Sequence, residues 1–178
     1  MKPKLLLHTC CAPCAGYVVQ LLQKDYDITG YFYNPNIHPE EEYQKRLAEE
    51  KRYFDKLGFE LIEGPYDMED WFKLTKGHEH DQERGERCWL CYRMRLEHVS
   101  RFARENGLDF FATTLSLSPH KDAEKINQIG REISEKLGIR FLEADFKKDN
   151  GFKKSLDISR AEWFYRQKYC GCVFSQKH

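Results

Sequence analysis

Residues 4–33 read KLLLHTCCAPCAGYVVQLLQKDYDITGYFY, and this stretch decides the fold. The apolar run from Lys4 to His8 predicts a short strand, and residues 15–23 carry apolar side chains at helical spacing. Aromatic and β-branched residues at 28–33 predict a second strand. A strand, a helix and a strand in this order predict a βαβ unit with two parallel strands. The loop with Cys10, Cys11 and Cys14 would follow the first strand.

The alternation of strands and helices continues along the chain. The patterns predict helices at 39–57, 68–76, 89–105 and 122–137, strands at 59–62, 110–113 and 139–142, and a mobile polar loop at 77–87. We therefore expect residues 1–178 to form a single α/β, Rossmann-like (HUP-like) domain of three layers. Its sheet would be mostly parallel and covered by helices on both faces.

The composition excludes few classes of function, but it bears on where in the cell the protein is expected. The chain has 29 basic and 29 acidic residues, so its overall charge argues neither for nor against nucleic acid. No apolar stretch approaches the ~20 residues that span a bilayer, and the chain's start lacks the apolar centre of a signal peptide. We expect a cytoplasmic protein with no membrane partner.

Seven cysteines carry the chemical signal. They form three groups, Cys10-Cys11-x-x-Cys14, Cys88-x-x-Cys91 and Cys170-x-Cys172. Because a reducing cytosol does not preserve structural disulfides, grouped thiols indicate metal ligands or redox-active groups. A cubane iron–sulfur cluster takes four thiolates and a structural zinc at most four. The other three thiols would complete a second metal site, act as redox or nucleophilic groups, or be inert.

The predicted sheet brings distant residues together. Ligands of open parallel sheets bind beyond the carboxyl ends of the strands, near the point where the strand order switches. The side chains expected there, besides the first cysteine group, are Tyr33, Asn34, Asn36, Thr113, Ser116 and Ser118. The Cys88 pair begins a helix, whose positive end favours thiolate. We therefore expect a metallocluster at this edge of the sheet.

Three sets of residues near the predicted site also have a structural interpretation. The segment with Asn34 and Asn36 either binds substrate hydroxyls or only builds a turn. His8 either donates a hydrogen bond to the cluster or is a satisfied core histidine. Asp81 and Glu83 are either oxygen ligands or proton donors, or else solvated loop charges.

The carboxyl-terminal segment, residues 146–178, is basic and aromatic. This composition is typical of surfaces that bind phosphates and stack bases. The candidate phosphate contacts are Lys121, Lys147, Lys148 and Arg166. The alternative is a solvated face over ordinary core aromatics.

The cysteine loop lacks the glycine-rich cradle that grips a triphosphate, so we do not expect ATP as a cofactor. Adjacent side chains splay apart, so Cys10 and Cys11 would not easily bind the same iron. One would then serve the cluster, and the other a second centre or the substrate.

Six motifs resemble those of a known family, the cobalamin-independent epoxyqueuosine reductases of the QueH type. They are His8-Thr9-Cys10-Cys11-Ala12-Pro13-Cys14, Phe32-Tyr33-Asn34-Pro35-Asn36-Ile37-His38-Pro39, Glu86-Arg87-Cys88-Trp89-Leu90-Cys91-Tyr92, Thr113-Thr114-Leu115-Ser116-Leu117-Ser118-Pro119, Asp145-Phe146-Lys147-Lys148 and Tyr169-Cys170-Gly171-Cys172-Val173-Phe174. The resemblance covers essentially the whole chain. It implies reduction of the epoxide of epoxyqueuosine at the tRNA wobble position to queuosine, with a 4Fe-4S cluster as electron carrier.

This reaction suggests a second metal. Removal of the epoxide oxygen consumes two electrons and two protons, whereas a cubane cluster usually passes one electron at a time. We expect a mononuclear iron beside the cluster, held by surplus cysteines, to act as a Lewis acid on the epoxide oxygen. All seven cysteines are candidate ligands, and Cys10, Cys11 and Cys14 are the catalytic candidates. The partners would be tRNA and an electron donor such as a ferredoxin or flavodoxin.

Three other classes of protein bind metal or use thiols in a similar way. A tRNA thiolation enzyme of the ATP-pyrophosphatase superfamily needs a phosphate loop after the first strand, which this chain lacks. A zinc-stabilised RNA-binding module would be colourless rather than brown. A dithiol oxidoreductase needs one C-x-x-C group at a helix start and not three cysteine groups.

Overall fold

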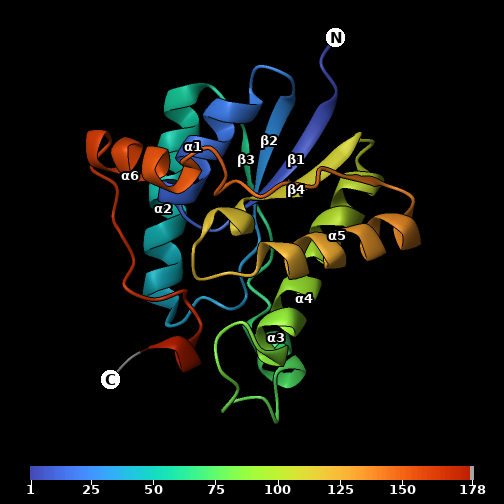
Figure 1. Cartoon of the computed structure of the whole chain (residues 1–178), viewed down its shortest axis with the longest axis vertical. Helices are drawn as coiled ribbons and strands as arrows, with labels where there is room; N and C mark the ends of the chain where they lie inside the picture. The colour runs from blue at the N-terminus through green and yellow to red at the C-terminus, as the bar shows by residue number, and fades with distance from the viewer. Residues whose placement is uncertain (177–178) are drawn as a thin grey trace.

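A five-stranded parallel sheet forms the centre of the computed structural model, which describes residues 1–176 (Figure 1). Lys177, part of the predicted basic segment, and His178 lie outside the described residues. The strands are β1 (Lys4–Thr9), β2 (Asp27–Phe32), β3 (Leu61–Glu63), β4 (Phe110–Thr113) and β5 (Arg140–Phe141), in the spatial order β3-β2-β1-β4-β5. The predicted α/β class and parallel sheet are confirmed.

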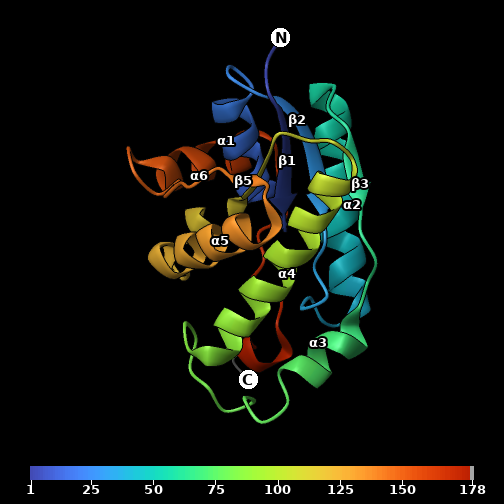
Figure 2. The same ribbon diagram turned by 90° about the vertical axis from the view of Figure 1, so that its right-hand side faces the viewer.

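Helices cover both faces of this sheet. On one face lie α1 (Ala12–Leu22), α2 (Glu40–Leu57) and α6 (Gly151–Ala161), and on the other α4 (Glu86–Glu105) and α5 (Ala123–Leu137). The short α3 (Met68–Leu74) lies near the amino-terminal end of α4, as the turned view shows (Figure 2). None of the helices in residues 1–176 is long and apolar enough to cross a membrane.

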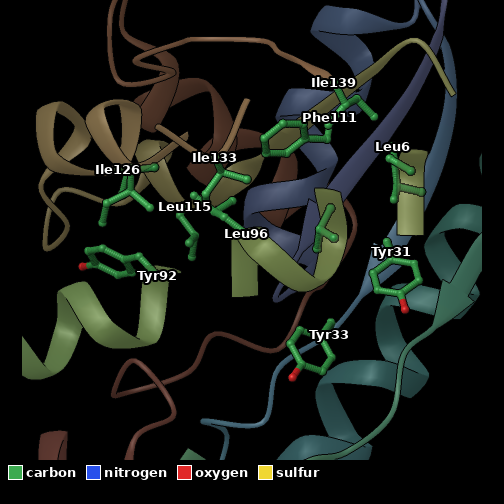
Figure 3. Packing of buried hydrophobic residues seen from close by; sticks show 13 residues of the cluster. Leu6, Tyr31, Tyr33, Tyr92, Leu96, Phe111, Leu115, Ile126, Ile133 and Ile139 are labelled. Atoms are coloured by element: carbon green, nitrogen blue, oxygen red, sulfur yellow. The ribbon is translucent and has the colours of Figure 1, made fainter. Parts of the chain in front are cut away.

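Alternate residues of β1 build the two halves of the core. Leu6 packs with Phe111, Leu96 and Ile126 on the α4/α5 side, where side chains from the sheet and both helices gather (Figure 3). Leu5 and Leu7 pack on the other side, against α1, α2 and α6. Successive strand residues face opposite sides of a sheet, so the apolar run Leu5, Leu6, Leu7 fits a central strand buried on both faces.

Three local features differ from the sequence expectation. Helix α1 begins at Ala12 rather than at residue 15, so Cys14 lies in its first turn. Helix α6 forms within the segment that was expected only to be basic and aromatic, after Asn150 in the left-handed conformation, with φ 59°. The loop predicted to be mobile is tethered, because Arg87 Nη1 donates to the carbonyls of His78, Glu79 and Asp81 at 2.7–3.0 Å.

The strand order defines where a site can form. β1 pairs with β2 on one side and with β4 on the other, so the chain switches direction across the sheet between β1 and β4. The loops that follow β1 and β4 diverge at the carboxyl edge of the sheet, between these two strands. Cys10 follows β1 directly, and the short 3₁₀ helix Thr114–Leu117 follows β4.

Candidate metal and active site

The first thiol group, which consists of Cys10, Cys11 and Cys14, sits where β1 passes into α1. Cys11 is the residue before the helix, with extended backbone, and the Cys14 amide closes the first turn by donating to the Cys11 carbonyl at 3.2 Å. The sulfurs of Cys10 and Cys11 are 3.9 Å apart and in hydrogen-bond contact. The expectation that these adjacent thiols splay apart is therefore wrong in this structure, because the extended residue and the tight turn after it bring both sulfurs to one side.

Contacts within the first group favour one thiolate. Hydrogen bonds from the Cys11 and Cys14 thiols hold the pKa of Cys10 well below its usual value. The contact with Cys10 raises the pKa of Cys11 to about 12, and the contacts with Cys10 and Cys11 raise the pKa of Cys14 well above its usual value. Cys11 also accepts a hydrogen bond from Gln167 Nε2 at 3.1 Å, so the carboxyl-terminal segment covers this thiol.

The second thiol group consists of the other four cysteines, which line one cavity. Cys88 and Cys91 lie on the first turns of α4, and Cys170 and Cys172 come from the carboxyl-terminal segment. A positive helix end and buried cations favour thiolate here. Burial raises the pKa of Cys170, but the charges of Lys121 and Arg95 and hydrogen bonds from the Cys172 amide and Ser175 together outweigh burial and lower it.

Two buried polar atoms face the cavity without a partner. Within residues 1–176, Trp71 Nε1 and Asn36 Oδ1 make no hydrogen bond, although both residues are almost fully buried. The pKa of the Cys91 thiol is raised by burial, and the Arg95 charge opposes that rise. An indole N–H is a donor only, so a sulfur acceptor in the cavity would satisfy it.

The donor set fits an iron–sulfur cluster, which is bound through cysteine thiolates with hydrogen bonds to sulfur. Four thiols, one unpaired N–H donor and nearby positive charge are the groups that such a cofactor requires. In the described residues, no three His, Cys, Asp or Glu side chains are grouped closely enough to hold one metal ion as they stand. Binding would therefore require the thiol side chains to rotate.

Helix α2 fixes the position of Cys170 and Cys172. Arg46, paired with Glu42 at 2.7 Å, donates to the carbonyls of Cys170 and Tyr169 at 3.1 and 3.2 Å. The His38 amide donates to the Gly171 carbonyl at 2.8 Å, and the Tyr169 hydroxyl donates to the His38 carbonyl. Residues that are more than 120 positions apart in the chain are thus joined at the cavity.

Several predicted substrate contacts are engaged inside the protein. Asn34 donates to the Thr9 carbonyl and accepts from Arg95. Thr113 Oγ1 lies 2.8 Å from His8 Nδ1 and accepts from the Leu115 amide. His8 is therefore a satisfied core histidine, with Nε2 3.1 Å from the Tyr33 carbonyl.

The other predicted contacts are dispersed. The Tyr33 ring stacks on His98 at 3.8 Å and its hydroxyl donates to Asp67, in a groove separate from the thiol cavity. Ser118 Oγ accepts from the His120 amide, whereas the buried Ser116 hydroxyl has no partner within residues 1–176. Of the predicted set, Asn36 and Lys121 line the cavity that holds the four thiols.

The predicted cations of the basic segment differ in availability. Lys147 Nζ already donates to the Ser116 carbonyl at 2.9 Å and pairs with Asp145 at 3.1 Å. Lys148 and Arg166 are exposed and form no ion pair within the described residues. Of the two acidic loop residues, Glu83 lines the cavity, while Asp81 accepts from the Arg87 amide and pairs with His78.

Sequence reasoning missed four buried residues around the thiols: Arg46, Glu50, Trp71 and Arg95. Glu50 has no hydrogen-bond partner for either carboxyl oxygen within residues 1–176, and burial raises its pKa well above the usual value. A signal was present, because Arg46 and Glu50 fall on the apolar face of α2 that also carries Tyr43, Leu47 and Phe54. A charged residue at a core position of an amphipathic helix indicates a function or a buried partner.

Comparisons with known proteins agree on one family. The model of the family described as "Epoxyqueuosine reductase QueH" matches residues 5–178. The epoxyqueuosine reductase QueH of Histophilus somni (strain 129Pt) is 43% identical over 174 residues, covering 97% of this chain and 72% of that protein. The protein of the same name from Dehalococcoides mccartyi (strain ATCC BAA-2266 / KCTC 15142 / 195) is 36% identical over 178 residues, covering 99% of this chain and 94% of that protein.

One solved structure shares the fold. The U34-tRNA thiolase NcsA from Methanococcus maripaludis, solved with its [4Fe-4S] cluster, superposes with a TM-score of 0.60 at 13% identity. The match covers 99% of this chain and 63% of that chain. At this identity the likeness shows a common architecture only.

Proposed function

The chain belongs to the epoxyqueuosine reductase QueH family, and from this premise we propose that it reduces the epoxide of epoxyqueuosine in tRNA to give queuosine. The reaction is a two-electron deoxygenation. The observation that carries the proposal is that thiols from both ends of the chain gather around the same cations: Arg95 and Lys121 line the cavity with four thiols, and Cys10 of the first group influences both charges.

The four-thiol cavity is the place we propose for a 4Fe-4S cluster. Cys88, Cys91, Cys170 and Cys172 would supply the ligands, and the Trp71 N–H would donate to a sulfur. When bound, such a cluster supplies single electrons for the reduction. The family and the donor set support the cluster, and the proposal includes neither cobalamin nor ATP.

A second metal, proposed as a mononuclear iron, would belong to the first thiol group. Two thiolates on one tetrahedral ion lie ~3.8 Å apart when each metal–sulfur distance is ~2.3 Å. The Cys10 and Cys11 sulfurs are already 3.9 Å apart. This spacing supports shared binding of one ion by the two thiols, with Cys14 in the first turn of α1 as a third ligand after its side chain rotates.

The surroundings of the first thiol group suit a reaction on an oxygen-containing substrate. Hydrogen bonds from the neighbouring thiols lower the pKa of Cys10, which keeps one thiolate available for the ion. Burial raises the pKa of Glu50 well above its usual value, which favours the protonated carboxyl. Glu50 would thus be a candidate source for one of the two protons that deoxygenation consumes.

The partners follow from the substrate. We propose that tRNA approaches over the exposed cations Lys148 and Arg166, because phosphates bind exposed positive charge. A ferredoxin or flavodoxin would deliver electrons, and the reaction would take place in the cytoplasm.

The test combines composition and turnover. Protein purified without oxygen should contain one 4Fe-4S cluster and about one further iron, giving more iron than sulfide. With a chemical reductant and tRNA that carries epoxyqueuosine, nucleoside analysis should show loss of epoxyqueuosine and gain of queuosine. A colourless zinc protein, or a brown protein that leaves epoxyqueuosine intact, would contradict the proposal.

A further inference from the structure

Arg95 on α4 is buried between the two thiol groups. It is 2% exposed, and it lines the cavity with Cys91 and Cys170. Its Nη2 donates to Asn34 Oδ1 at 2.6 Å and its Nε to His8 Nε2 at 3.3 Å. Asn34 is an uncharged amide. His8 is neutral as well, because burial and the Arg95 charge lower its pKa to about 3. The guanidinium is therefore fixed in place by groups that do not balance its charge.

Lys121, in the loop before α5, is a second cation at the same cavity. Within residues 1–176, neither Lys121 nor Arg95 forms an ion pair with a carboxylate. Glu83 is the carboxylate that lines the cavity. Burial lowers the pKa of both cations, and nearby thiols raise it again: Cys91 and Cys10 for Arg95, Cys170 and Cys10 for Lys121.

A buried charge without a counter-charge is costly, so a protein retains one where something else neutralises it. Here the groups that face both cations are cysteines of both thiol groups. Thiolates bound to a metal centre all keep their negative charge, whereas burial raises the pKa of the free Cys88, Cys91 and Cys172 thiols, so the metal-free site carries less negative charge. The two cations are thus arranged for the metal-loaded state of the site.

We propose that Arg95 and Lys121 are the built-in counter-charge of the metal centre and raise its reduction potential. The inference rests on the cluster proposed above. Each one-electron reduction adds one negative charge to the cofactor, and a fixed cation nearby stabilises the reduced form more than the oxidised form. Arg95 has the larger effect because its planar fork is held by two hydrogen bonds between the thiol groups. Both residues act on the cofactor's electronics and are not sources of electrons or protons.

The test uses Arg95→Met and a matched control, Arg104→Met, which removes an exposed arginine from the same helix. Stepwise reduction with dithionite, followed by EPR, gives the midpoint potential of each loaded protein. Arg95→Met should shift the reduction equilibrium at least tenfold toward the oxidised form, ~59 mV for a one-electron couple. The control should leave the potential at the wild-type value, and Arg95→Lys should restore part of the shift.

The thermal stability of metal-free protein provides a second measurement, to be compared with that of loaded protein. Without the centre the charge of Arg95 is balanced less completely, so Arg95→Met should lower the midpoint temperature of loaded protein and destabilise metal-free protein less, or stabilise it. Lys121→Gln breaks no hydrogen bond of Arg95 and should lower the reduction potential by less than Arg95→Met does. It tests the inference if Arg95→Met fails to retain the cluster.

Two outcomes separate this inference from the proposed function. Wild-type protein without an iron–sulfur cluster would overturn the proposed cofactor and this inference together. A normal cluster whose potential is unchanged in Arg95→Met and Lys121→Gln would overturn the inference alone.

Discussion

Arg46 Nη1 donates a hydrogen bond of 3.1 Å to the carbonyl oxygen of Cys170, which lies 124 positions later in the chain. Because the guanidinium is also paired with Glu42, it is held rigidly on α2. The cysteine segment is therefore fixed through its backbone, which leaves the thiols free to bind. Two of the four thiols of the cavity depend on this hydrogen bond for their position.

Gly171→Ala tests how strictly this segment is positioned. Gly171 has φ +118°, and an added Cβ would lie 2.9 Å from Ile37 Cγ1. We expect the variant to lose ~1–3 kcal/mol of unfolding free energy and much of its iron. The control is Gly107→Ala, where φ is +66° and no atom lies within 4 Å, so only backbone strain is added. Thermal unfolding and iron content check both, and equal iron in the two variants would contradict a strict position.

The four-thiol cavity makes a direct prediction about the cluster. Replacing Cys88 or Cys91 by Ala should abolish the visible absorption of the cluster, because a cubane with three thiolate ligands is labile. Iron and sulfide analysis after anaerobic purification measures the loss, with circular dichroism to show that the chain is folded. Full iron and sulfide in both variants would rule out these cysteines as ligands.

The sheet and its site edge were predictable because the signals are local. The apolar and β-branched patterns predict strands β1, β2 and β4, and the polar residues that follow each strand are then placed at the carboxyl edge of the sheet. The hydrogen bonds that join the thiol segments were not predictable, because they are long-range. Arg46 meets Cys170, and Gln167 meets Cys11, only after α2 and the last segment have packed. Asn34 and Thr113 lie at the predicted edge of the sheet. Their side chains form hydrogen bonds with the buried Arg95 and His8 rather than facing a substrate.

Buried Glu50 should make stability depend on pH. Burial raises the pKa of Glu50 in the folded state above its unfolded value of ~4.3. The folded state therefore holds the Glu50 proton to higher pH than the unfolded state does. The stabilising contribution of Glu50 to the free energy of unfolding is complete below pH ~4.3 and is lost as pH rises through the raised folded pKa. Glu50→Gln should remove this loss, so the variant gains stability over wild type as pH rises above ~4.3 toward the raised folded pKa. Urea unfolding of metal-free protein measures it.

Glu41→Gln is the control for Glu50, since Glu41 is an exposed carboxylate on the same helix. It should follow the wild-type pH dependence. If Glu50→Gln runs parallel to Glu41→Gln at every pH, then Glu50 is ionised in the folded protein and the expected shift is absent.

Exposed cations of the basic segment should contribute to tRNA binding. Replacing Lys148 and Arg166 by Gln should weaken binding, because fewer counterions are released from the phosphates. The slope of log affinity against log salt should fall by ~0.7–0.9 for each phosphate that is no longer neutralised. Lys24→Gln is the control, since Lys24 is an exposed cation near the amino end of β2, away from the thiols. Binding measured at several salt concentrations decides it, and equal slopes for the double variant and the control would place the tRNA surface elsewhere.

Cys10 and Cys11 provide the sharpest test of how the metals are divided. Their sulfurs are 3.9 Å apart, the spacing of two thiolates on one ion, whereas the sequence favoured separate centres for them. If they share one ion, Cys10→Ala and Cys11→Ala should behave alike. Both should keep the cubane absorption, lose the iron that exceeds sulfide, and lose epoxide reduction. If the thiols are divided between centres, one variant loses the cubane and the other keeps it. Unequal spectra would show that the two sulfurs are not a shared ligand pair, and normal turnover by both variants would remove the second metal from the mechanism.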